Sequence, residues 1–358
     1  MKRVGFLTSG GDCQGLNAAM RGVALALYGR FPNLEIYGIQ KGYQGLIHGN
    51  YKKMTKADFD PILNEGGTIL GTSRTPFKLI HVPEADGTDK VKAMKANYEK
   101  WKLDCLVILG GNGTHKTANL LSREGLNVVT LPKTIDNDIW GTDLTFGFQS
   151  AIEVATRSLD ELKTTAASHD RIFLVELMGH KTGWLTLYSG IAGGADVILI
   201  PEIPYDVSVV AKALKRKREQ GRNYFILAVA EGAMSKAEAA MTKRERKQWM
   251  RENGSLAPVY RIEPELKEKL EAEVRVTVPG HVQRGGAPCP YDRMLASRLG
   301  AAAAALIADG RFGYMVSVKG EEIVPVPLEE VAGKLKKVDP SSSVVEEARG
   351  LGICFGDQ

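Results

Sequence analysis

Residues 4–12 (VGFLTSGGD) and residues 105–114 (CLVILGGNGT) share one pattern: a short apolar run of β type, a pair of glycines and then a helical stretch. Glycines at the end of a strand let backbone N–H groups approach a phosphate, and the N-terminus of the following helix adds a partial positive charge. Neither segment matches the dinucleotide G-x-G-x-x-G or the P-loop with its Gly-Lys-Ser/Thr ending. The repetition predicts two phosphate-binding loops on adjacent strands.

The alternation of β-type and helical segments continues along nearly the whole chain. Further strands are expected at residues 34–39, 128–131, 172–177, 197–200, 225–230 and 274–278. Helices are expected between them, at residues 18–28, 90–102, 116–123, 152–165, 209–220 and 293–308. This order predicts an α/β protein whose parallel sheets are covered by helices on both faces. Such sheets bind ligands at the carboxyl ends of their strands.

Composition excludes several classes of protein. Glycine supplies 39 of 358 residues, where average usage of about 7% would give roughly 25, but the surplus has no collagen period. The net charge of +5 suits anionic small molecules and gives no support to nucleic-acid binding. The cysteines form no zinc-ligand or disulfide pattern, and no stretch reaches 18 apolar residues. We therefore expect a cytoplasmic protein without a membrane or nucleic-acid partner.

A charge-rich region at residues 235–269 interrupts this order. It places Lys243, Arg244, Arg246, Lys247 and Arg251 close together on an expected helix. A solvated helical face is the simpler interpretation, and a patch that binds nucleic acid or a partner protein is the alternative.

Two further loops carry chemically suggestive side chains. Residues 66–74 (GGTILGTSR) end in Arg74, whose guanidinium can hold two phosphate oxygens at once. Residues 132–138 (PKTIDND) follow a buried strand and place Asp136 and Asp138 two positions apart beside Lys133. Close carboxylates repel, which can raise the pKa of one of them into the range of a general base, or the two can share a metal. A simple Asx-rich turn is the alternative.

Together with later motifs, these loops resemble the 6-phosphofructokinase family. The resemblance runs from residue 4 to about residue 309, through TSGGD, GGTILGTSR, GGNGT, PKTIDND, SHDR, VELMG, IAGGAD, PEIP, PGHVQRGG and PYDR. It implies two Rossmann-like, three-layer α/β/α domains with mostly parallel sheets. Residues 1–147 plus 283–333 would bind the phosphoryl donor, and residues 148–282 plus 334–358 would bind the sugar phosphate.

The resemblance also implies roles for individual residues in phosphorylating fructose 6-phosphate with ATP and Mg²⁺, in glycolysis. Asp136 would take the proton of the sugar's 1-hydroxyl, Asp138 would support it and the metal-bound phosphate, and Thr134 would orient the sugar. Lys133 and Arg74 would add positive charge. The donor would be bound by Gly11, Arg74, Thr75, Gly111, Asn112, Gly113 and Thr114. The sugar phosphate would be bound by Thr134, Asp136, Arg171, Met178, Gly179, His180, Glu231, Arg275, His281 and Arg284.

Two departures from the family pattern concern the metal and the transferred charge. Asn112 stands where the family usually has a Mg²⁺-binding aspartate, so the metal would be held weakly by Asn112 and indirectly by Asp138. His180 stands where many bacterial members have arginine. These departures leave open a catalytically weak regulatory paralogue that binds sugar phosphate. A lipid or NAD kinase, suggested by the G-G-x-G-T loop alone, is a more distant alternative.

Donor, sugar and assembly are expected from the same resemblance. Gly113 resembles ATP users because a side chain there would crowd the nucleotide, whereas Lys133 resembles pyrophosphate users; ATP is favoured and pyrophosphate stays the alternative. Sedoheptulose 7-phosphate stays possible beside fructose 6-phosphate. Arg171 and Arg275 would reach a neighbouring subunit's site, which implies a homo-oligomer, a dimer or more usually a tetramer. Leu25 lacks the basic character of the bacterial effector site.

Overall fold

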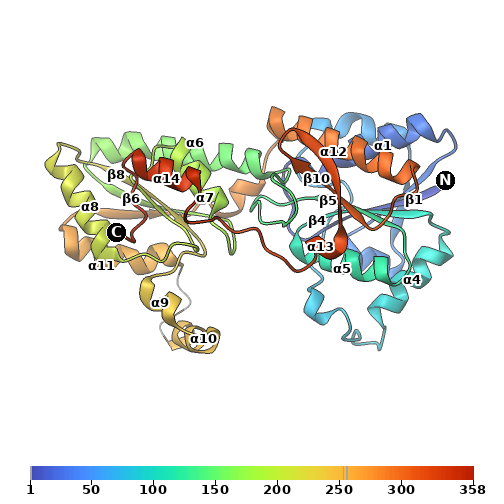
Figure 1. The fold of residues 1–358 in the computed structure, drawn as a ribbon, viewed down its shortest axis with the longest axis horizontal. Coiled ribbons are helices and arrows are strands. Elements are labelled where there is room, and N and C mark those ends of the chain that lie inside the picture. The colour runs from blue at the N-terminus through green and yellow to red at the C-terminus, as the bar shows by residue number, and fades with distance from the viewer. Residues whose placement is uncertain (1, 253, 255–256) are drawn as a thin grey trace. The chain divides into compact units, whose positions relative to one another are not determined.

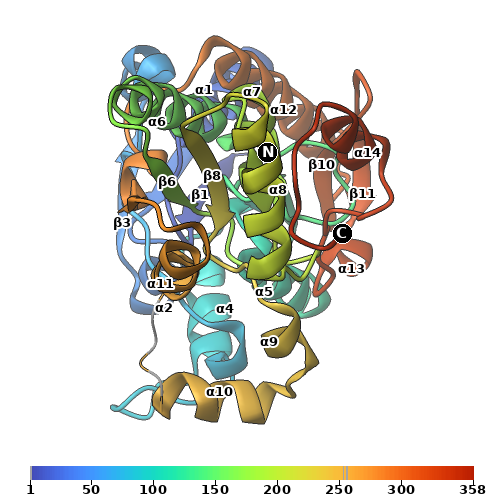
Figure 2. The same ribbon diagram turned by 90° about the vertical axis from the view of Figure 1, so that its left-hand side faces the viewer.

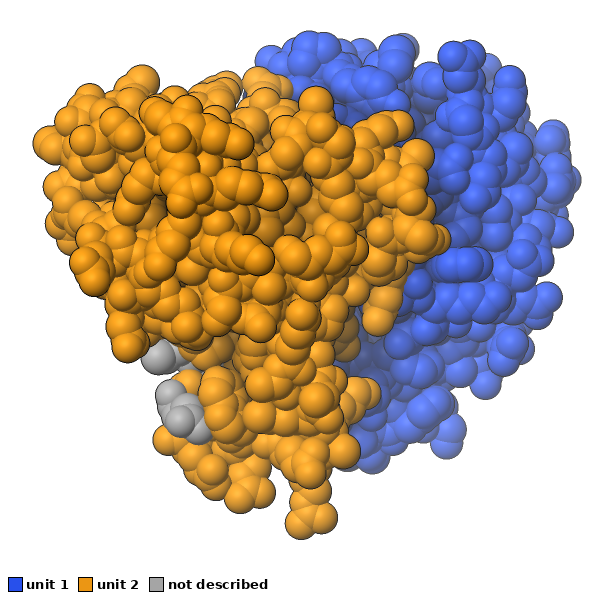
Figure 3. Space-filling model, turned by 60° about the vertical axis from the view of Figure 1, so that its left-hand side comes forward, with its two compact units in different colours: residues 1–150, 284–336 blue, residues 151–283, 337–358 orange. Residues whose placement is uncertain are grey.

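The computed structural model describes residues 2–252, 254 and 257–358. It divides the chain into two compact units, each assembled from separate stretches (Figure 3). Unit 1 comprises residues 1–150 and 284–336, and unit 2 comprises residues 151–283 and 337–358. The boundaries between these units differ from the expected domain boundaries at residues 148–150, 283 and 334–336.

Unit 1 is built on a seven-stranded sheet with the order β11-β10-β5-β4-β1-β2-β3. Its five inner strands are parallel, and the two edge strands, β3 and β11, are antiparallel to their neighbours. Helices cover both faces, which explains why the central strands read as nearly continuous apolar runs. The strands are β1 (Arg3–Ser9), β2 (Glu35–Ile39), β3 (Tyr51–Met54), β4 (Cys105–Gly110), β5 (Val128–Pro132), β10 (Tyr314–Lys319) and β11 (Glu322–Pro327).

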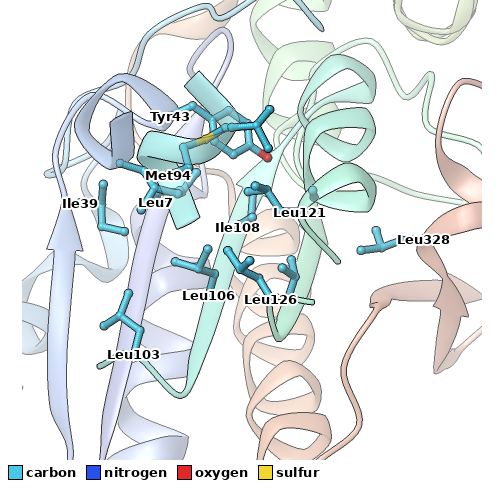
Figure 4. Close-up of a cluster of buried hydrophobic side chains, with 14 of the residues drawn as sticks. Leu7, Ile39, Tyr43, Met94, Leu103, Leu106, Ile108, Leu121, Leu126 and Leu328 are labelled. Atoms are coloured by element: carbon cyan, nitrogen blue, oxygen red, sulfur yellow. The ribbon is translucent and has the colours of Figure 1, made fainter. Parts of the chain in front are cut away.

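The helices of unit 1 form a layer on each face of this sheet (Figure 1). One layer consists of α1 (Leu16–Arg30) and α12 (Pro290–Ala308). These two helices pack so closely that a Cβ at Gly300 would lie 2.7 Å from the backbone oxygen of Ala19, so glycine is needed at this contact. The other layer buries Tyr43, Met94 and Leu121 against Leu106 and Ile108 of β4 (Figure 4). That layer consists of α2 (Tyr43–His48), α4 (Lys90–Lys100), α5 (Asn112–Arg123) and α13 (Leu328–Val331). Short turns complete the unit: α3 (Lys56–Phe59) and 3₁₀ helices at Asp60–Asn64 and Phe77–Leu79.

Unit 2 is a smaller three-layer unit with four parallel strands in the order β7-β8-β6-β9. The strands are β6 (Ile172–Leu177), β7 (Val197–Leu199), β8 (Phe225–Ala230) and β9 (Val274–Thr277). Alternate residues of β6 point into two different hydrophobic clusters, Ile172 and Leu174 into one and Phe173 and Val175 into the other. The first cluster includes α8 (Val207–Glu219) and α11 (Pro258–Leu270); the second includes α6 (Phe148–Ser168), α7 (Trp184–Ala192) and α14 (Ser343–Gly350).

The charge-rich region of unit 2 forms α9 (Lys236–Ala240), α10 (Lys243–Glu252) and α11. No described residue of α10 is buried, and the helix projects away from the sheet of its unit (Figure 2). The expected helix is therefore present, and most of its described residues are exposed. Across the described part of the chain, no helix combines the length and the apolar character that crossing a membrane requires.

Candidate functional site

Three of the expected loops leave the sheet of unit 1 from neighbouring strands in register. Ser9 at the end of β1 pairs with Gly110 at the end of β4, and Gly110 pairs with Pro132 at the end of β5. The remaining neighbour of β1 is β2, so the strand order reverses between β1 and β4. Ligands of open parallel sheets bind at such a reversal, outside the carboxyl ends of the strands. The loops 10–15, 110–114 and 132–138 therefore begin side by side where a ligand is expected.

Two hydrogen bonds to the backbone of Gly10 hold the arginine-bearing loop beside the first of these loops. The Gly10 N–H donates to the Ser73 carbonyl over 3.0 Å, and the Thr72 hydroxyl donates to the Gly10 carbonyl over 2.7 Å. Arg74 and Thr75 follow directly, with Arg74 exposed. The Thr75 hydroxyl is buried and has no hydrogen-bond partner among the described residues. A buried hydroxyl of this kind needs an explanation, and a phosphate oxygen would supply the missing partner.

The second glycine loop leads into the N-terminus of α5. Gly111 precedes the helix, and its residue type supplies no side chain to cap the first-turn N–H groups. The Thr114 hydroxyl donates to the Ser9 carbonyl over 3.3 Å, which ties this helix to the loop after β1. Gly113 is exposed, and a Cβ there would meet no described atom within 4 Å. The first turn of α5 is therefore open to an anion.

The buried side chain of His115 contacts the backbone at the start of this turn. Its ring is fully buried, and Nδ1 lies 2.8 Å from the Gly111 carbonyl, so the ring donates from Nδ1. Burial lowers the pKa of His115 to about 4. The neutral imidazole is therefore the form that the fold requires.

The contribution of His115 to the free energy of unfolding should fall as the ring is forced to ionise in acid. Because the folded pKa of about 4 lies below the ordinary value of 6.5, the contribution is complete above pH 6.5 and is lost between pH 6.5 and 4. At pH 5 the loss should be about 2 kcal/mol. Urea unfolding at pH 7.5 and pH 5 tests this, with His115→Gln beside the control His169→Gln, which alters an exposed ring. An equally steep acid loss in His115→Gln would contradict the assignment.

The PKTIDND loop is fixed by its own side chains. The Asp136 N–H donates to the Thr134 hydroxyl over 3.0 Å, and the Thr145 hydroxyl donates to the Thr134 carbonyl over 2.7 Å. Asn137 adopts a left-handed backbone with φ of 50°, and its side-chain oxygen accepts the Thr145 N–H over 3.1 Å. These contacts leave Asp136 half-buried, and one of its carboxylate oxygens, Oδ1, is buried.

Charge is concentrated in and beside this loop. Lys133 is only 3% exposed and donates to the Gly11 carbonyl, and burial lowers the pKa of its ammonium. Burial, followed by the charge of Asp136, raises the pKa of Asp138 to about 7. Burial also lowers the pKa of nearby Lys336 to about 8. Two carboxyl groups and two lysines thus share a poorly solvated region beside both glycine loops.

Arg284 lies against the first glycine loop of the same unit. Its Nη1 donates to the Asp12 carbonyl over 2.9 Å, and a Cβ at Gly11 would lie only 2.8 Å from that nitrogen. Glycine at position 11 therefore makes room for this guanidinium.

In unit 2, another group of expected residues gathers at the carboxyl ends of β6 and β8. One Glu231 carboxylate oxygen accepts the N–H groups of Gly179 and His180, over 3.2 and 2.6 Å. Gly179 and His180 both have positive φ, 145° and 52°. The Met178 N–H donates to the Gln283 side chain over 3.2 Å, and His281 is exposed two residues before it. The structure thus brings Met178, Gly179, His180 and Glu231 together.

Two expected residues lie at the opposite end of that sheet. Arg171 precedes β6, and Arg275 of β9 pairs in register with Phe173 near the start of β6. Both guanidiniums bind the Glu273 carboxylate, Arg171 over 2.8 Å. Since a strand rises about 3.3 Å per residue, the length of β6 separates this pair from the turn at Met178 by roughly 20 Å. Arg171 and Arg275 therefore do not join the group at the carboxyl ends within their own unit.

Comparison with known proteins identifies the family. The phosphofructokinase family model matches residues 3–307. The chain belongs to the phosphofructokinase family.

Relatives within the phosphofructokinase family are similar over the full chain. The ATP-dependent 6-phosphofructokinase of Spirochaeta thermophila is 54% identical, over 99% of this chain and 97% of its own length. The ATP-dependent 6-phosphofructokinase 3 of Bacteroides thetaiotaomicron is 45% identical, over 99% of this chain and 100% of its own. The crystal structure of Pichia pastoris phosphofructokinase in the T-state superposes with a TM-score of 0.78 at 34% identity and covers 92% of this chain. The chain spans 35% of that Pichia chain. The resemblance and the fold class expected from the sequence are thereby confirmed.

Some residues that shape these loops were not anticipated from the sequence. Asn137 lies inside a quoted motif, and its left-handed backbone is a conformation that asparagine tolerates well. Gln283 also lies within a motif, between two residues that were assigned. Lys336 lies beyond all the motifs, and nothing in the surrounding sequence distinguishes it from the exposed lysines at positions 334 and 337.

Proposed function

We propose that this protein is an ATP-dependent 6-phosphofructokinase, which transfers the terminal phosphoryl group of ATP to the 1-hydroxyl of fructose 6-phosphate in glycolysis, in the cytoplasm. The observation that carries this proposal is the register of Ser9, Gly110 and Pro132. It aligns two phosphate-binding loops with a loop that holds two carboxylates. The relatives named ATP-dependent, and the open space at Gly113, support ATP as the donor.

Asp136 would act as the general base. Its carboxylate would take the proton of the sugar's 1-hydroxyl as that oxygen attacks the terminal phosphorus and the bond to the ADP oxygen breaks. Positioning and positive charge contribute most to such a transfer. Lys133 and Arg74 would supply side-chain charge, and the backbone amides of Gly11 and Gly113 would supply fixed donors. Thr134, whose hydroxyl already fixes the Asp136 backbone, would orient the sugar.

The family implies a divalent metal, and the residues near the donor loops could supply only a few ligands to it. The described residues contain no group of three or more His, Cys, Asp or Glu side chains that could cage an ion. Mg²⁺ commonly binds one or two carboxylates together with substrate phosphates, so a full cage is not required. Asp138, indirectly, and the amide oxygen of Asn112, more weakly, would hold Mg²⁺, which would neutralise charge on the donor phosphates. The amide nitrogen of Asn112 faces the Lys334 carbonyl, which leaves the oxygen for this role.

The sugar phosphate would be held by Met178, Gly179, His180, Glu231, His281 and Arg284. Arg171 and Arg275 would serve the site of another subunit in a homo-oligomer, a dimer or a tetramer. Their position at the far end of β6 from the turn at Met178 supports this, because neither arginine can span roughly 20 Å within its own unit.

A two-donor assay tests function and donor together. We expect purified protein with fructose 6-phosphate and Mg²⁺ to form fructose 1,6-bisphosphate with ATP, and at least ten-fold more slowly with pyrophosphate. Product from pyrophosphate alone would overturn the donor and support the pyrophosphate-dependent alternative that Lys133 suggests. No product from either donor would overturn the catalytic proposal. Sedoheptulose 7-phosphate in place of fructose 6-phosphate tests the sugar.

A further inference from the structure

The three residues at the end of unit 1, Lys334, Leu335 and Lys336, form a segment that contacts the PKTIDND loop. We call it the 334–336 segment. Leu335 forms an antiparallel bridge with Ile139, and the Lys336 N–H donates to the Asp138 carbonyl over 2.9 Å. The chain direction at Asp138 is therefore fixed by a partner almost 200 residues later in the sequence.

The same segment contacts the first turn of α5. The side-chain amide nitrogen of Asn112 donates to the Lys334 carbonyl. An ionised aspartate at position 112 has no N–H and could not make this bond. The departure at Asn112 thus has a structural role, because it links the second glycine loop to the 334–336 segment.

The Lys336 side chain adds two stronger contacts beyond Asp138. Its ammonium donates to the Thr142 carbonyl over 3.0 Å and to the Asp143 carbonyl over 2.7 Å. Both acceptors are main-chain atoms, so the ammonium holds the backbone of the turn that follows Asp138. Charged donors make stronger hydrogen bonds than neutral ones, and a partly buried ammonium has little water to replace them.

We propose that Lys336 is a positioning residue for phosphoryl transfer, which holds the turn at Thr142 and Asp143 and so fixes Asp138 relative to the first turn of α5. This inference rests on the proposed function. The inference concerns the side chain of Lys336 and not its backbone, because the hydrogen bond from the residue 336 N–H to the Asp138 carbonyl survives any substitution except proline. Displacement of a reacting group by about 1 Å can cost roughly 10²-fold in rate.

The test compares two lysines that contact the same turn. Lys336→Met removes the ammonium but keeps the length of the chain. Lys319→Met is the matched control, because the Lys319 ammonium reaches Asp143 only through its exposed carboxylate, over 3.2 Å. We expect kcat to fall about 10- to 100-fold in Lys336→Met, with KM for ATP and fructose 6-phosphate within about three-fold of wild type. Lys319→Met should stay within about two-fold in kcat.

Hydrogen exchange gives a second measurement that needs no activity. Peptides covering residues 137–146 should exchange faster in Lys336→Met than in wild type or Lys319→Met, while peptides from β1 should be unchanged. If Lys336→Met fails to fold, Lys336→Gln replaces it, since its shorter amide can reach at most one carbonyl and should give an intermediate kcat.

Three results would overturn the inference: a kcat within two-fold of wild type in a folded Lys336 variant, an equal loss in Lys319→Met, or unchanged exchange at residues 137–146. An inactive wild-type protein would instead refute the proposed function. The exchange comparison would still report whether Lys336 fixes the turn.

Discussion

Asp136→Asn should lower kcat for fructose 6-phosphate phosphorylation by about 10²- to 10⁴-fold, because an amide cannot accept the hydroxyl proton in the transition state. KM for the sugar should change little, since asparagine keeps the size of the side chain. The backbone bond from residue 136 to the Thr134 hydroxyl does not depend on the substituted group, so the loop should keep its shape. Initial rates of fructose 1,6-bisphosphate formation over a range of both substrates measure the effect.

Asp143→Asn is the control for this experiment. Asp143 lies in the same region but is half-exposed, and its carboxylate contacts Lys319 and the Gly320 N–H, which an amide oxygen can also accept. Its kcat should stay within about two-fold of wild type. If Asp136→Asn kept most of its kcat while KM rose, Asp136 would bind the sugar without acting as the base.

Gly113→Asp should have opposite effects on the stability of the fold and on the use of ATP. A Cβ at this position meets no described atom, φ is not positive, and an acidic side chain in the first turn of a helix is favourable. We expect the free energy of unfolding to rise by about 1 kcal/mol. In contrast, kcat/KM for ATP should fall at least about 100-fold, because the carboxylate would crowd and repel the donor phosphates.

Gly113→Asn distinguishes size from charge in this comparison. It adds nearly the same volume without the negative charge, so its loss in kcat/KM for ATP should be smaller than that of Gly113→Asp. Wild-type kcat/KM in both variants would mean that the first turn of α5 does not approach the donor. The argument for ATP from this glycine would then fail.

The central elements of the fold were predictable because they are buried. All eight expected strands are present, and seven of them are largely buried apolar runs, whereas β9 (VRVT) buries only Val274. Among the strands that were not expected, β10 (YMVSVK) buries four of its six residues, whereas β3 and β11 are edge strands with weak patterns. Three of the four residues of β3 are exposed, and β11 contains Pro325 and Pro327, which ordinarily argue against a strand. The α7 helix was missed because WLTLYSGIA is apolar on most of its surface and lacks a polar stripe.

The candidate site was predictable where its residues lie close together in sequence. The spacing of Asp136 and Asp138 and the glycine pairs point to phosphate chemistry without any knowledge of the fold. Lys336 could not be found in this way, because its contacts to Thr142 and Asp143 cross more than 190 positions. Such contacts depend on how the chain returns to the sheet, which no local pattern encodes.

The register of β1, β4 and β5 also sets a scale. Neighbouring strands lie about 4.8 Å apart, so the loops that leave from Ser9, Gly110 and Pro132 begin at regular intervals of that size. A slip of one residue between β4 and β5 would move the start of the loop after β5 by about 3.3 Å and turn the side chains of β5 to the opposite face of the sheet. Substitutions in the sheet core that disturb this alignment should therefore impair activity before they unfold the protein, although none of them touches a substrate.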